Sequence, residues 1–178
     1  MTERIIISGF GGQGVLSAGL MLAESAVHIG LEATFFPSYG IEMRGGTANC
    51  HVIISDKKIG APLITEVDTL MAFNEPSLLK FADMVADGGL IMMNSSVIKK
   101  EFDFPGKTVV KVPMETMALD TLGNLKIANI IMIGRYIRER LVITLEEMKR
   151  SIHDKFVKKG ESMVNLNYKA LELGYNLV

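Results

Sequence analysis

The feature that most constrains this chain is the glycine-rich stretch SGFGGQGVLSAG, which directly follows the apolar run RIII. Gly9, Gly11 and Gly14 fit the spacing G-x-G-x-x-G. Gly12 and Gln13 lie between them and are not required by that spacing. An apolar β-branched run before the loop and a helical periodicity after it predict a buried strand, a tight turn and a helix. Because glycines allow positive φ and helix N-termini favour anions, the loop predicts a site for a phosphate-type group.

The rest of the chain alternates between strand-like and helix-like segments. The segments EATFFPS, TANCHVIIS, VDTLMAFN, GGLIMMN and TVVKVP are typical of strands, and KIGAPLI is a weaker strand candidate. The segment after the glycine loop places Leu16, Leu20, Ala23 and Val27 at helical spacing, and a further helix is expected over about 76–86. Strands that alternate with helices predict the α/β class and a mostly parallel sheet.

After Pro113 the pattern becomes helical. MALDTLGN predicts a short helix that ends at Gly123, and LKIANIIMIGRYIRERL predicts a longer one that is buried or covered by another subunit. TLEEMKRSIHDKFVKKG opens with Thr144 and Glu147, which have the spacing of a capping box. We therefore expect a single domain over residues 1–178. It should have a Rossmann-like sheet of about six or seven strands, mostly parallel and flanked by helices, and a helical C-terminal part.

Composition and charge exclude several classes of protein. Apolar residues make up 48% of the chain, which argues against disorder, and 19 basic residues balance 20 acidic ones without long charged runs. We therefore expect neither a nucleic-acid binder nor a membrane-surface protein. The apolar run IANIIMIG is too short to span a bilayer, and MTERIII does not resemble a signal peptide, so we expect a cytoplasmic protein. The 12 methionines fit either a Met-rich core or a surface that a partner covers.

A second loop, YGIEMRGG, follows the second expected strand and should lie at the same sheet edge as the glycine loop. Its Arg44 would bring a planar cation suited to carboxylate or phosphate, and the alternative is a local ion pair with Glu42. A dinucleotide site would need an acid at the tip of the second strand, where the chain instead reads FFPSYG. Glu32 lies at the other end of that strand, so an NAD(P)-dependent oxidoreductase is disfavoured. The glycine loop then binds an anionic ligand, docks another backbone, or is a tight turn chosen for packing.

No catalytic or metal-binding constellation is found in the sequence. Cys50 and His51 are neighbours on an expected strand, so their side chains point to opposite faces and cannot form a nucleophile–base pair. We expect Cys50 to be a buried structural residue, and a single cysteine can form neither an internal disulfide nor an Fe–S site. His28 and His153 belong to no cluster with metal-ligand spacing. The sequence therefore predicts no catalytic residues and no metal ligands in this chain.

Several motifs together resemble the gamma subunit of the 2-oxoacid:ferredoxin oxidoreductases. GFGGQGV and YGIEMRGGTANCHVIIS carry the resemblance, and MAFNEPSLLKFADMVADGGLIMMNSS and LGNLKIANIIMIG extend it over most of the chain. The chain departs from the family pattern at Ile41, where we would expect proline, which bears on the rigidity of that loop but not on the identity of the motif. The second loop is closer to the 2-oxoglutarate or branched-chain branch of the family than to the pyruvate branch.

The resemblance implies a subunit of an enzyme that oxidatively decarboxylates a 2-oxoacid, transfers the acyl group to coenzyme A and reduces ferredoxin. It implies that thiamine diphosphate, Mg²⁺ and Fe–S clusters are held by partner subunits. The expected partners are the alpha and beta subunits, which bind thiamine diphosphate, and a ferredoxin-like delta subunit is a further candidate. This chain would bind no cofactor firmly and would not be catalytic when isolated. It would contact either coenzyme A, which is the co-substrate, or the thiamine-binding subunits.

The residues expected at this contact site belong to the two loops. They are Gly9, Gly11, Gly12, Gln13, Gly14, Tyr39, Glu42, Arg44, Gly45 and Gly46. The alternative that the sequence leaves open is a stand-alone nucleotide- or coenzyme A-binding module without a redox partner.

Overall fold

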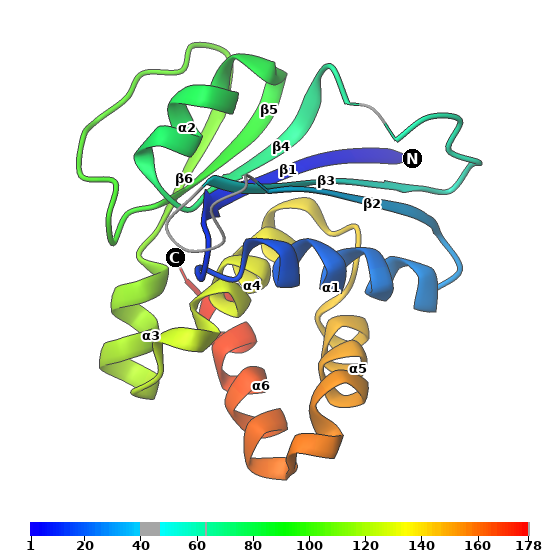
Figure 1. The fold of residues 1–178 in the computed structure, drawn as a ribbon, viewed down its shortest axis with the longest axis vertical. Coiled ribbons are helices and arrows are strands. Elements are labelled where there is room, and N and C mark those ends of the chain that lie inside the picture. Colours follow the sequence, from blue (N-terminus) through cyan, green and yellow to red (C-terminus); the bar gives the residue numbers. More distant parts are fainter. Residues whose placement is uncertain (40–46, 63, 178) are drawn as a thin grey trace.

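The computed structural model describes residues 1–39, 47–62 and 64–177. Within them, six strands form one sheet in the order β2-β3-β1-β4-β5-β6 (Figure 1). The strands are β1 (Thr2–Phe10), β2 (Glu32–Tyr39), β3 (Thr47–Ser55), β4 (Val67–Ala72), β5 (Val85–Asn94) and β6 (Thr108–Val112). Strands β1, β4, β5 and β6 run parallel to one another, whereas β3 runs antiparallel to both of its neighbours. The expected α/β domain with a mostly parallel sheet is confirmed.

The antiparallel strand β3 lies between the first two strands of the chain. It pairs with all of β1 on one side and with all of β2 on the other. Strand β2 is therefore left at the border of the sheet, where Pro37 is tolerated because an edge strand does not need every N–H for pairing. The prediction of a weak strand in KIGAPLI was wrong, because residues 58–62 and Ile64 form no strand. Gly60 and Pro62 both disfavour a strand there.

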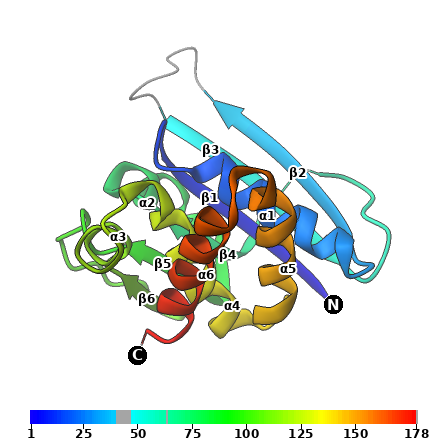
Figure 2. The ribbon, with the colours of Figure 1, turned by 90° about the horizontal axis from the view of Figure 1, so that it is seen from below.

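Helices cover both faces of the sheet. The helices are α1 (Val15–His28), α2 (Glu75–Phe81), α3 (Met114–Leu122), α4 (Ala128–Arg140), α5 (Leu145–Phe156) and α6 (Glu161–Tyr175), with short 3-10 turns η1 (Ala82–Met84), η2 (Leu125–Ile127) and η3 (Val157–Lys159). Helices α1 and α4 pack on one face, and α2 with η1 packs on the other. Figure 2 shows α5 and α6 in front of α1 and α4, so that they form an outer layer on the first face.

The helix ends follow the sequence signals. Thr144 Oγ1 accepts from the Glu147 N–H at 3.3 Å, and Glu147 Oε2 accepts from the Thr144 N–H at 2.7 Å, so the capping box is confirmed. Gly123 has a φ of 64° and ends α3 as expected. The helix expected over 76–86 is shorter, because Val85 already pairs with Val67 in the sheet.

The buried face of α1 differs in part from the expected one. Ala23 is buried and Leu16 packs against the core, but Leu20 and Val27 are 36% and 55% exposed. The other residues that face the sheet and the neighbouring helices are Val15, Ala18, Met21, Leu22 and Ala26. Gly19 explains the change, because a Cβ at this position would lie 2.4 Å from Sγ of Cys50 on β3. The helix therefore approaches the sheet closely through its small residues rather than through the leucine stripe.

Helix α4 is buried within the chain itself. A Cβ on Gly134 would lie 2.1 Å from the Leu171 carbonyl oxygen of α6, and a Cβ on Gly174 would lie 1.9 Å from the Ile131 carbonyl oxygen. The two helices therefore cross at direct backbone contact, which only glycines on both sides allow. Of the two interpretations left open for the apolar α4 segment, burial inside this chain is correct.

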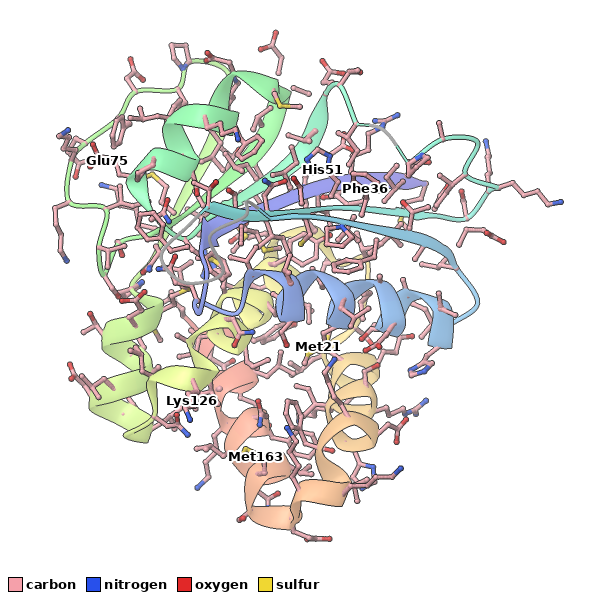
Figure 3. All side chains as sticks on the ribbon, in the orientation of Figure 1. Met21, Phe36, His51, Glu75, Lys126 and Met163 are labelled. Atoms are coloured by element: carbon pink, nitrogen blue, oxygen red, sulfur yellow. The ribbon has the colours of Figure 1, made fainter. Side chains whose placement is uncertain are left out.

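The methionines belong mostly to the core. Seven of them are at most 1% exposed, and they are Met21, Met71, Met92, Met93, Met114, Met132 and Met148. Figure 3 shows Met21 on the side of α1 that faces the outer helices. A flexible thioether side chain fills the irregular spaces between sheet and helices, so the core interpretation accounts for most of the methionine content.

Candidate functional site

Four segments that are far apart in the sequence meet at the carboxyl ends of the parallel strands. The glycine loop follows β1, residues 73–74 follow β4, Asn94 ends β5, and Glu115 lies in the first turn of α3, after β6. Open α/β sheets bind ligands at this edge, because the loops there are free to vary while the sheet holds them in place. We call this region the carboxyl edge, and it is the candidate site.

The glycine loop makes a tight turn between Phe10 and Gln13. The Gln13 N–H donates to the Phe10 carbonyl at 3.2 Å, and the Phe10 N–H donates to Gln13 Oε1 at 2.7 Å. The backbone and the side chain of Gln13 therefore both close the turn around Gly11 and Gly12. Gly12 has a φ of 98°, and a Cβ there would meet no atom of the described residues within 4 Å. Gly12 is needed for its backbone conformation, and no described residue fills the space beside it.

Gly9 and Gly14 are needed for packing as well as for the turn. A Cβ on Gly9 would lie 2.7 Å from Gln13 Oε1 and 2.8 Å from the Cβ of Phe73. A Cβ on Gly14 would lie 2.7 Å from Nδ2 of Asn129, which donates to the Gly14 carbonyl at 3.1 Å. The interpretation of the glycine loop as a tight turn chosen for packing therefore holds for these two glycines and does not extend to Gly12.

The start of α1 offers backbone donors at this edge. Gly14 is the N-cap of α1, with a φ of 77° and no side-chain cap. In the part of the chain that the structure describes, the N–H groups of Gly11, Gly12 and Gly14 donate to no other protein atom. Unpaired N–H groups at the positive end of a helix dipole favour an anion, so the arrangement suits a phosphate or a carboxylate.

The Gln13 amide is held from four sides. Its Oε1 accepts from the Phe10 N–H at 2.7 Å and from Nδ2 of Asn74 at 3.4 Å. Its Nε2 donates to the Phe73 carbonyl at 3.2 Å and to Oε1 of Glu115 at 3.0 Å. The amide therefore connects the glycine loop to the segment after β4 and to α3.

Two more side chains complete this network. Asn94 is fully buried, and its Nδ2 donates to the Phe73 carbonyl and to Glu115 Oε1, both at 3.1 Å. Ser96 Oγ accepts from the N–H groups of Glu115 and Thr116, both at 3.0 Å, and so caps α3 from outside the helix. Loops after β1, β4 and β5 are thus linked to the start of α3 by side-chain hydrogen bonds.

The sequence analysis did not identify Asn74, Asn94 or Glu115. A signal for the two asparagines was present, because each stands at the carboxyl end of consecutive parallel strands, in AFN and MMN. An amide at that position can satisfy backbone groups of the neighbouring loop. Glu115 carried no such signal, because its partners come from distant parts of the chain.

Much of the second expected loop lies outside the described residues. This applies to Glu42, Arg44, Gly45 and Gly46, so their proposed contacts stay predictions. The flanking backbone is described: Tyr39 of β2 pairs with Ala48, and Thr47 of β3 pairs with Phe10. Both flanks of this segment therefore lie at the carboxyl edge, as the sequence analysis expected.

Cys50 and His51 lie on opposite faces of β3. Cys50 is fully buried against α1, and burial raises the pKa of its thiol to about 12, which makes it unreactive. His51 is half-buried on the other face with Phe36 (Figure 3), and its ring lies edge-on to Phe81 with centroids 6.4 Å apart. Burial lowers the pKa of His51. The structural interpretation of Cys50 is confirmed.

The described residues contain neither a metal-ligand cluster nor a membrane-spanning helix. Among residues 1–39, 47–62 and 64–177, no three His, Cys, Asp or Glu side chains are grouped closely enough to hold a metal ion. Over the same ranges, the helices are all too short or too polar to cross a membrane.

The opposite edge of the sheet carries a second polar cluster, which the sequence analysis also missed. Glu3 Oε1 lies 3.1 Å from Nε of Arg140 and accepts from Thr69 Oγ1 at 2.7 Å. Arg140 Nε also donates to Thr69 Oγ1 at 2.9 Å, and its NH2 group donates to the Asp68 carbonyl. The hydroxyl of Tyr136 is buried beside this cluster. We call this region the amino edge.

Comparison with known proteins places the chain among oxidoreductase subunits. It is 38% identical over 173 residues to the ketoisovalerate oxidoreductase subunit VorA of Methanothermobacter thermautotrophicus, a match that covers 96% of this chain and 35% of the relative. It is 32% identical over 168 residues to the 2-oxoglutarate synthase subunit KorC of Methanocaldococcus jannaschii, covering 93% of this chain and 89% of that protein. The chain thus spans about a third of the first relative and most of the second.

Solved structures agree with these matches. The gamma subunit of a keto/oxoacid ferredoxin oxidoreductase from Geobacter sulfurreducens superposes with a TM-score of 0.84 and 29% identity, over 98% of this chain and 95% of that one. A 2-oxoglutarate:ferredoxin oxidoreductase from Magnetococcus marinus, with 2-oxoglutarate, coenzyme A and succinyl-CoA bound, superposes with a TM-score of 0.88 and 25% identity. That match covers 97% of this chain and 30% of the larger one. The family model for pyruvate ferredoxin/flavodoxin oxidoreductase matches residues 4–177, and the chain belongs to this family.

Proposed function

We propose that this chain is the gamma subunit of a 2-oxoacid:ferredoxin oxidoreductase. Such an enzyme converts a 2-oxoacid, coenzyme A and two oxidised ferredoxins into an acyl-CoA, CO₂, a proton and two reduced ferredoxins. The observation that carries the proposal is the match to a gamma subunit of known structure along nearly the full length of both chains. The chain would complete the assembly and would not be catalytic when isolated.

The glycine loop is the proposed contact to coenzyme A. Coenzyme A carries a pyrophosphate and a ribose phosphate, and the N–H groups of Gly11, Gly12 and Gly14 offer donors to such anions. No described residue fills the space beside Gly12, which supports a ligand at this position. A relative of the same fold has coenzyme A bound, which supports this choice over a free phosphate. The second loop, with Tyr39, Glu42, Arg44, Gly45 and Gly46, is the proposed opposite wall.

The cofactors of the reaction would lie on partner chains. The single cysteine is fully buried and cannot ligate an Fe–S cluster, so the residues of this chain do not fit that group. We propose that thiamine diphosphate, Mg²⁺ and the clusters are held by alpha and beta subunits and by a ferredoxin-like delta subunit, in a cytoplasmic complex. Relatives that are about three times longer than this chain are consistent with such partners, because they carry further sequence in the same polypeptide.

We propose 2-oxoglutarate or a branched-chain 2-oxoacid as the substrate class. The sequence of the second loop favours these branches, and the relatives include a ketoisovalerate oxidoreductase subunit and a 2-oxoglutarate synthase subunit. Selection among 2-oxoacids would lie with the partner chains, because the described part of this chain presents a site for an anion rather than a pocket for the reacting carbonyl.

Isolation of the native complex tests this proposal. The chain is purified under anaerobic conditions from its own cells through an affinity tag, and the material is assayed for coenzyme A-dependent reduction of ferredoxin with pyruvate, 2-oxoglutarate and 2-oxoisovalerate. We expect thiamine-binding subunits to co-purify and turnover to be fastest with one of the latter two substrates. A clean monomer that binds coenzyme A without partners would support the stand-alone module instead.

A further inference from the structure

We propose that Gln13 is a positioning residue for the glycine loop and that the carboxylate of Glu115 orients its amide. This inference rests on the proposed function, because the loop is taken to contact coenzyme A. It goes beyond that function by giving Gln13 a role through the backbone of Gly11 and Gly12 rather than through contact with the ligand. It also adds Glu115 and Asn94 to the residues on which the site depends.

The hydrogen bonds of Gln13 leave its amide no free position toward a ligand. A glutamine amide has two acceptor positions and two donors. Both acceptor positions are used by Phe10 and Asn74, and both donors are used by the Phe73 carbonyl and by Glu115. A ligand could reach this amide only by breaking a bond inside the protein. Gln13 therefore acts on the site through the shape of the loop.

The two bonds between Gln13 and Phe10 determine that shape. One runs from the Gln13 N–H to the Phe10 carbonyl, and the other runs from the Phe10 N–H to the Gln13 side chain. They close the turn from both ends, so the N–H groups of Gly11 and Gly12 are held at its tip. Gly12 has a φ of 98°, which is only one of the many backbone conformations that a glycine can adopt. The two hydrogen bonds between Gln13 and Phe10 restrict the loop before binding, so a ligand that orders the loop loses less conformational entropy.

Glu115 is one of four groups that determine which way the amide points. The Phe10 N–H and Nδ2 of Asn74 can only donate, so they require the oxygen of the amide. The Phe73 carbonyl and the Glu115 carboxylate can only accept, so they require its nitrogen. A flipped amide would oppose like groups at all four contacts. A carboxylate at position 115 therefore keeps Oε1 of Gln13 directed at the loop.

The Glu115 carboxylate is itself fixed by neutral donors. Nδ2 of the buried Asn94 donates to the same oxygen at 3.1 Å, and the backbone N–H of Glu115 is bonded to Ser96. No ion pair involves Glu115 within the described residues. Among the described residues, a second carboxylate at this point would meet no compensating cation, and it would repel Glu115.

Gln13→Glu makes that change with almost no change in shape. The variant keeps an oxygen toward Phe10 and replaces the donor to Glu115 by a carboxylate oxygen about 3.0 Å away. Gln13→Glu combined with Glu115→Gln restores a donor between the two positions. The recovery is partial, because the new amide nitrogen faces Nδ2 of Asn94, which is also a donor, and the Phe73 carbonyl keeps only its bond from Asn94. Asn165→Asp is the matched control, since it makes the same amide-to-carboxylate exchange on an exposed part of α6.

The experiment measures KM for coenzyme A and kcat in the assembled complex. We expect Gln13→Glu to raise KM about tenfold with kcat within about twofold, because a loosened loop weakens binding without touching the reacting atoms. The double variant should recover at least about threefold of that loss, and Asn165→Asp should match the wild type. An unchanged KM in Gln13→Glu, or a double variant no better than the single one, would overturn the proposal.

Two further variants keep the outcome decisive. If the Gln13→Glu chain does not assemble, Glu115→Ala removes the orienting carboxylate alone, and a KM for coenzyme A equal to that of the wild type would then refute the role of Glu115. Gly12→Val separates this inference from the proposed function. If Gly12→Val also leaves KM unchanged, the loop does not contact coenzyme A. If only Gly12→Val changes KM, the contact stands and the positioning role of Gln13 is wrong.

Discussion

The two edges of the sheet hold their loops with different chemistry. At the carboxyl edge, the neutral amides of Gln13 and Asn94 donate to the carboxylate of Glu115, and no described residue lies against the nearby Gly12. At the amino edge, the charged pair Glu3 and Arg140 closes over the strands, and Glu3 is only 7% exposed. The amides fix the geometry of the glycine loop, whereas the ion pair and its hydrogen bonds join the strands to the end of α4.

This difference indicates that the amino edge contributes mainly to the stability of the fold and the carboxyl edge mainly to ligand binding. At the amino edge Glu3 is buried and Arg140 is half-buried, so removal of Arg140 leaves the Glu3 carboxylate in a low-dielectric setting. The carboxyl edge carries open N–H groups at a helix start, which add little to folding and are suited to an anionic ligand. We therefore expect substitutions at the amino edge to change the stability of the fold. Substitutions at the carboxyl edge should change ligand binding more than stability.

Arg140→Met should have the largest effect on stability. It keeps the apolar stem but leaves the Glu3 carboxylate with Thr69 as its remaining partner, at a cost of about 3 kcal/mol in the free energy of unfolding. Urea denaturation of the chain measures this, with Arg150→Met on an exposed part of α5 as the control. A loss below about 0.5 kcal/mol, the size of an ordinary surface substitution, would mean that the amino edge does not secure the fold.

Gly12→Val and Gly30→Val should each lower the free energy of unfolding by about 1–2 kcal/mol. Both glycines have positive φ, at 98° and 83°, and a Cβ at either position would meet no described atom within 4 Å. The strain is therefore similar although one glycine lies at the carboxyl edge and the other follows α1 at its far end. A much larger loss for Gly12→Val would show that the glycine loop secures the fold and would erase the contrast between the edges.

The amino edge should also give the fold a pH dependence. Burial raises the pKa of Glu3 above 4.5, although the hydrogen bond from Thr69 and the charge of Arg140 lower it. The folded state then binds the proton more tightly than the unfolded state does. The contribution of Glu3 to stability is therefore complete below pH 4.5 and is lost as the pH rises through the folded pKa.

The comparison with Glu3→Gln isolates this effect. The free energy of unfolding of the wild type, relative to that of the variant, should fall as the pH is raised from about 4 to 7. Denaturation curves at several pH values give the difference directly. A difference that is flat or rises with pH would mean that the ion pair with Arg140 outweighs burial at this edge.

Tyr136→Phe should have the smallest effect. Burial raises the pKa of Tyr136 well above its usual value of 10, and the nearby Glu3 carboxylate raises it further. Within the part of the chain that the structure describes, the hydroxyl still forms no hydrogen bond of normal geometry. Removal of an unsatisfied buried hydroxyl should leave the melting temperature unchanged or raise the stability by up to about 1 kcal/mol. A loss of about 1 kcal/mol or more would show that the hydroxyl is bonded to the amino-edge cluster.

The sequence predicted the local parts of this fold well. Strands, the glycine turn and the capping box at Thr144 depend on neighbours within a few residues, so spacing and propensity are enough. The place of β3 between β1 and β2 was not predicted, because strand order depends on tertiary pairing rather than on periodicity. The exposed Leu20 and Val27 show the same limit, since the close approach at Gly19 outweighed the apolar stripe.

The candidate site was predicted only in part. The glycine loop and its place before α1 followed from the motif, but the link from Gln13 to Glu115 joins residues 102 positions apart. The amino-edge cluster is similarly distributed, with Arg140 and Thr69 separated by 71 positions. Side-chain networks of this kind carry no local signature. The two asparagines at strand ends are the exception, because their position on the strand gave a usable signal.

The central claim is that the glycine loop of this chain contacts coenzyme A in the assembled oxidoreductase. Calorimetric titration of coenzyme A into complexes that contain the wild type, Gly30→Val or Gly12→Val tests it most directly, because the two variants carry the same backbone strain. We predict that Gly30→Val binds like the wild type and that Gly12→Val binds at least about tenfold more weakly, a difference of about 1.4 kcal/mol. Equal affinity in all three complexes would contradict the claim.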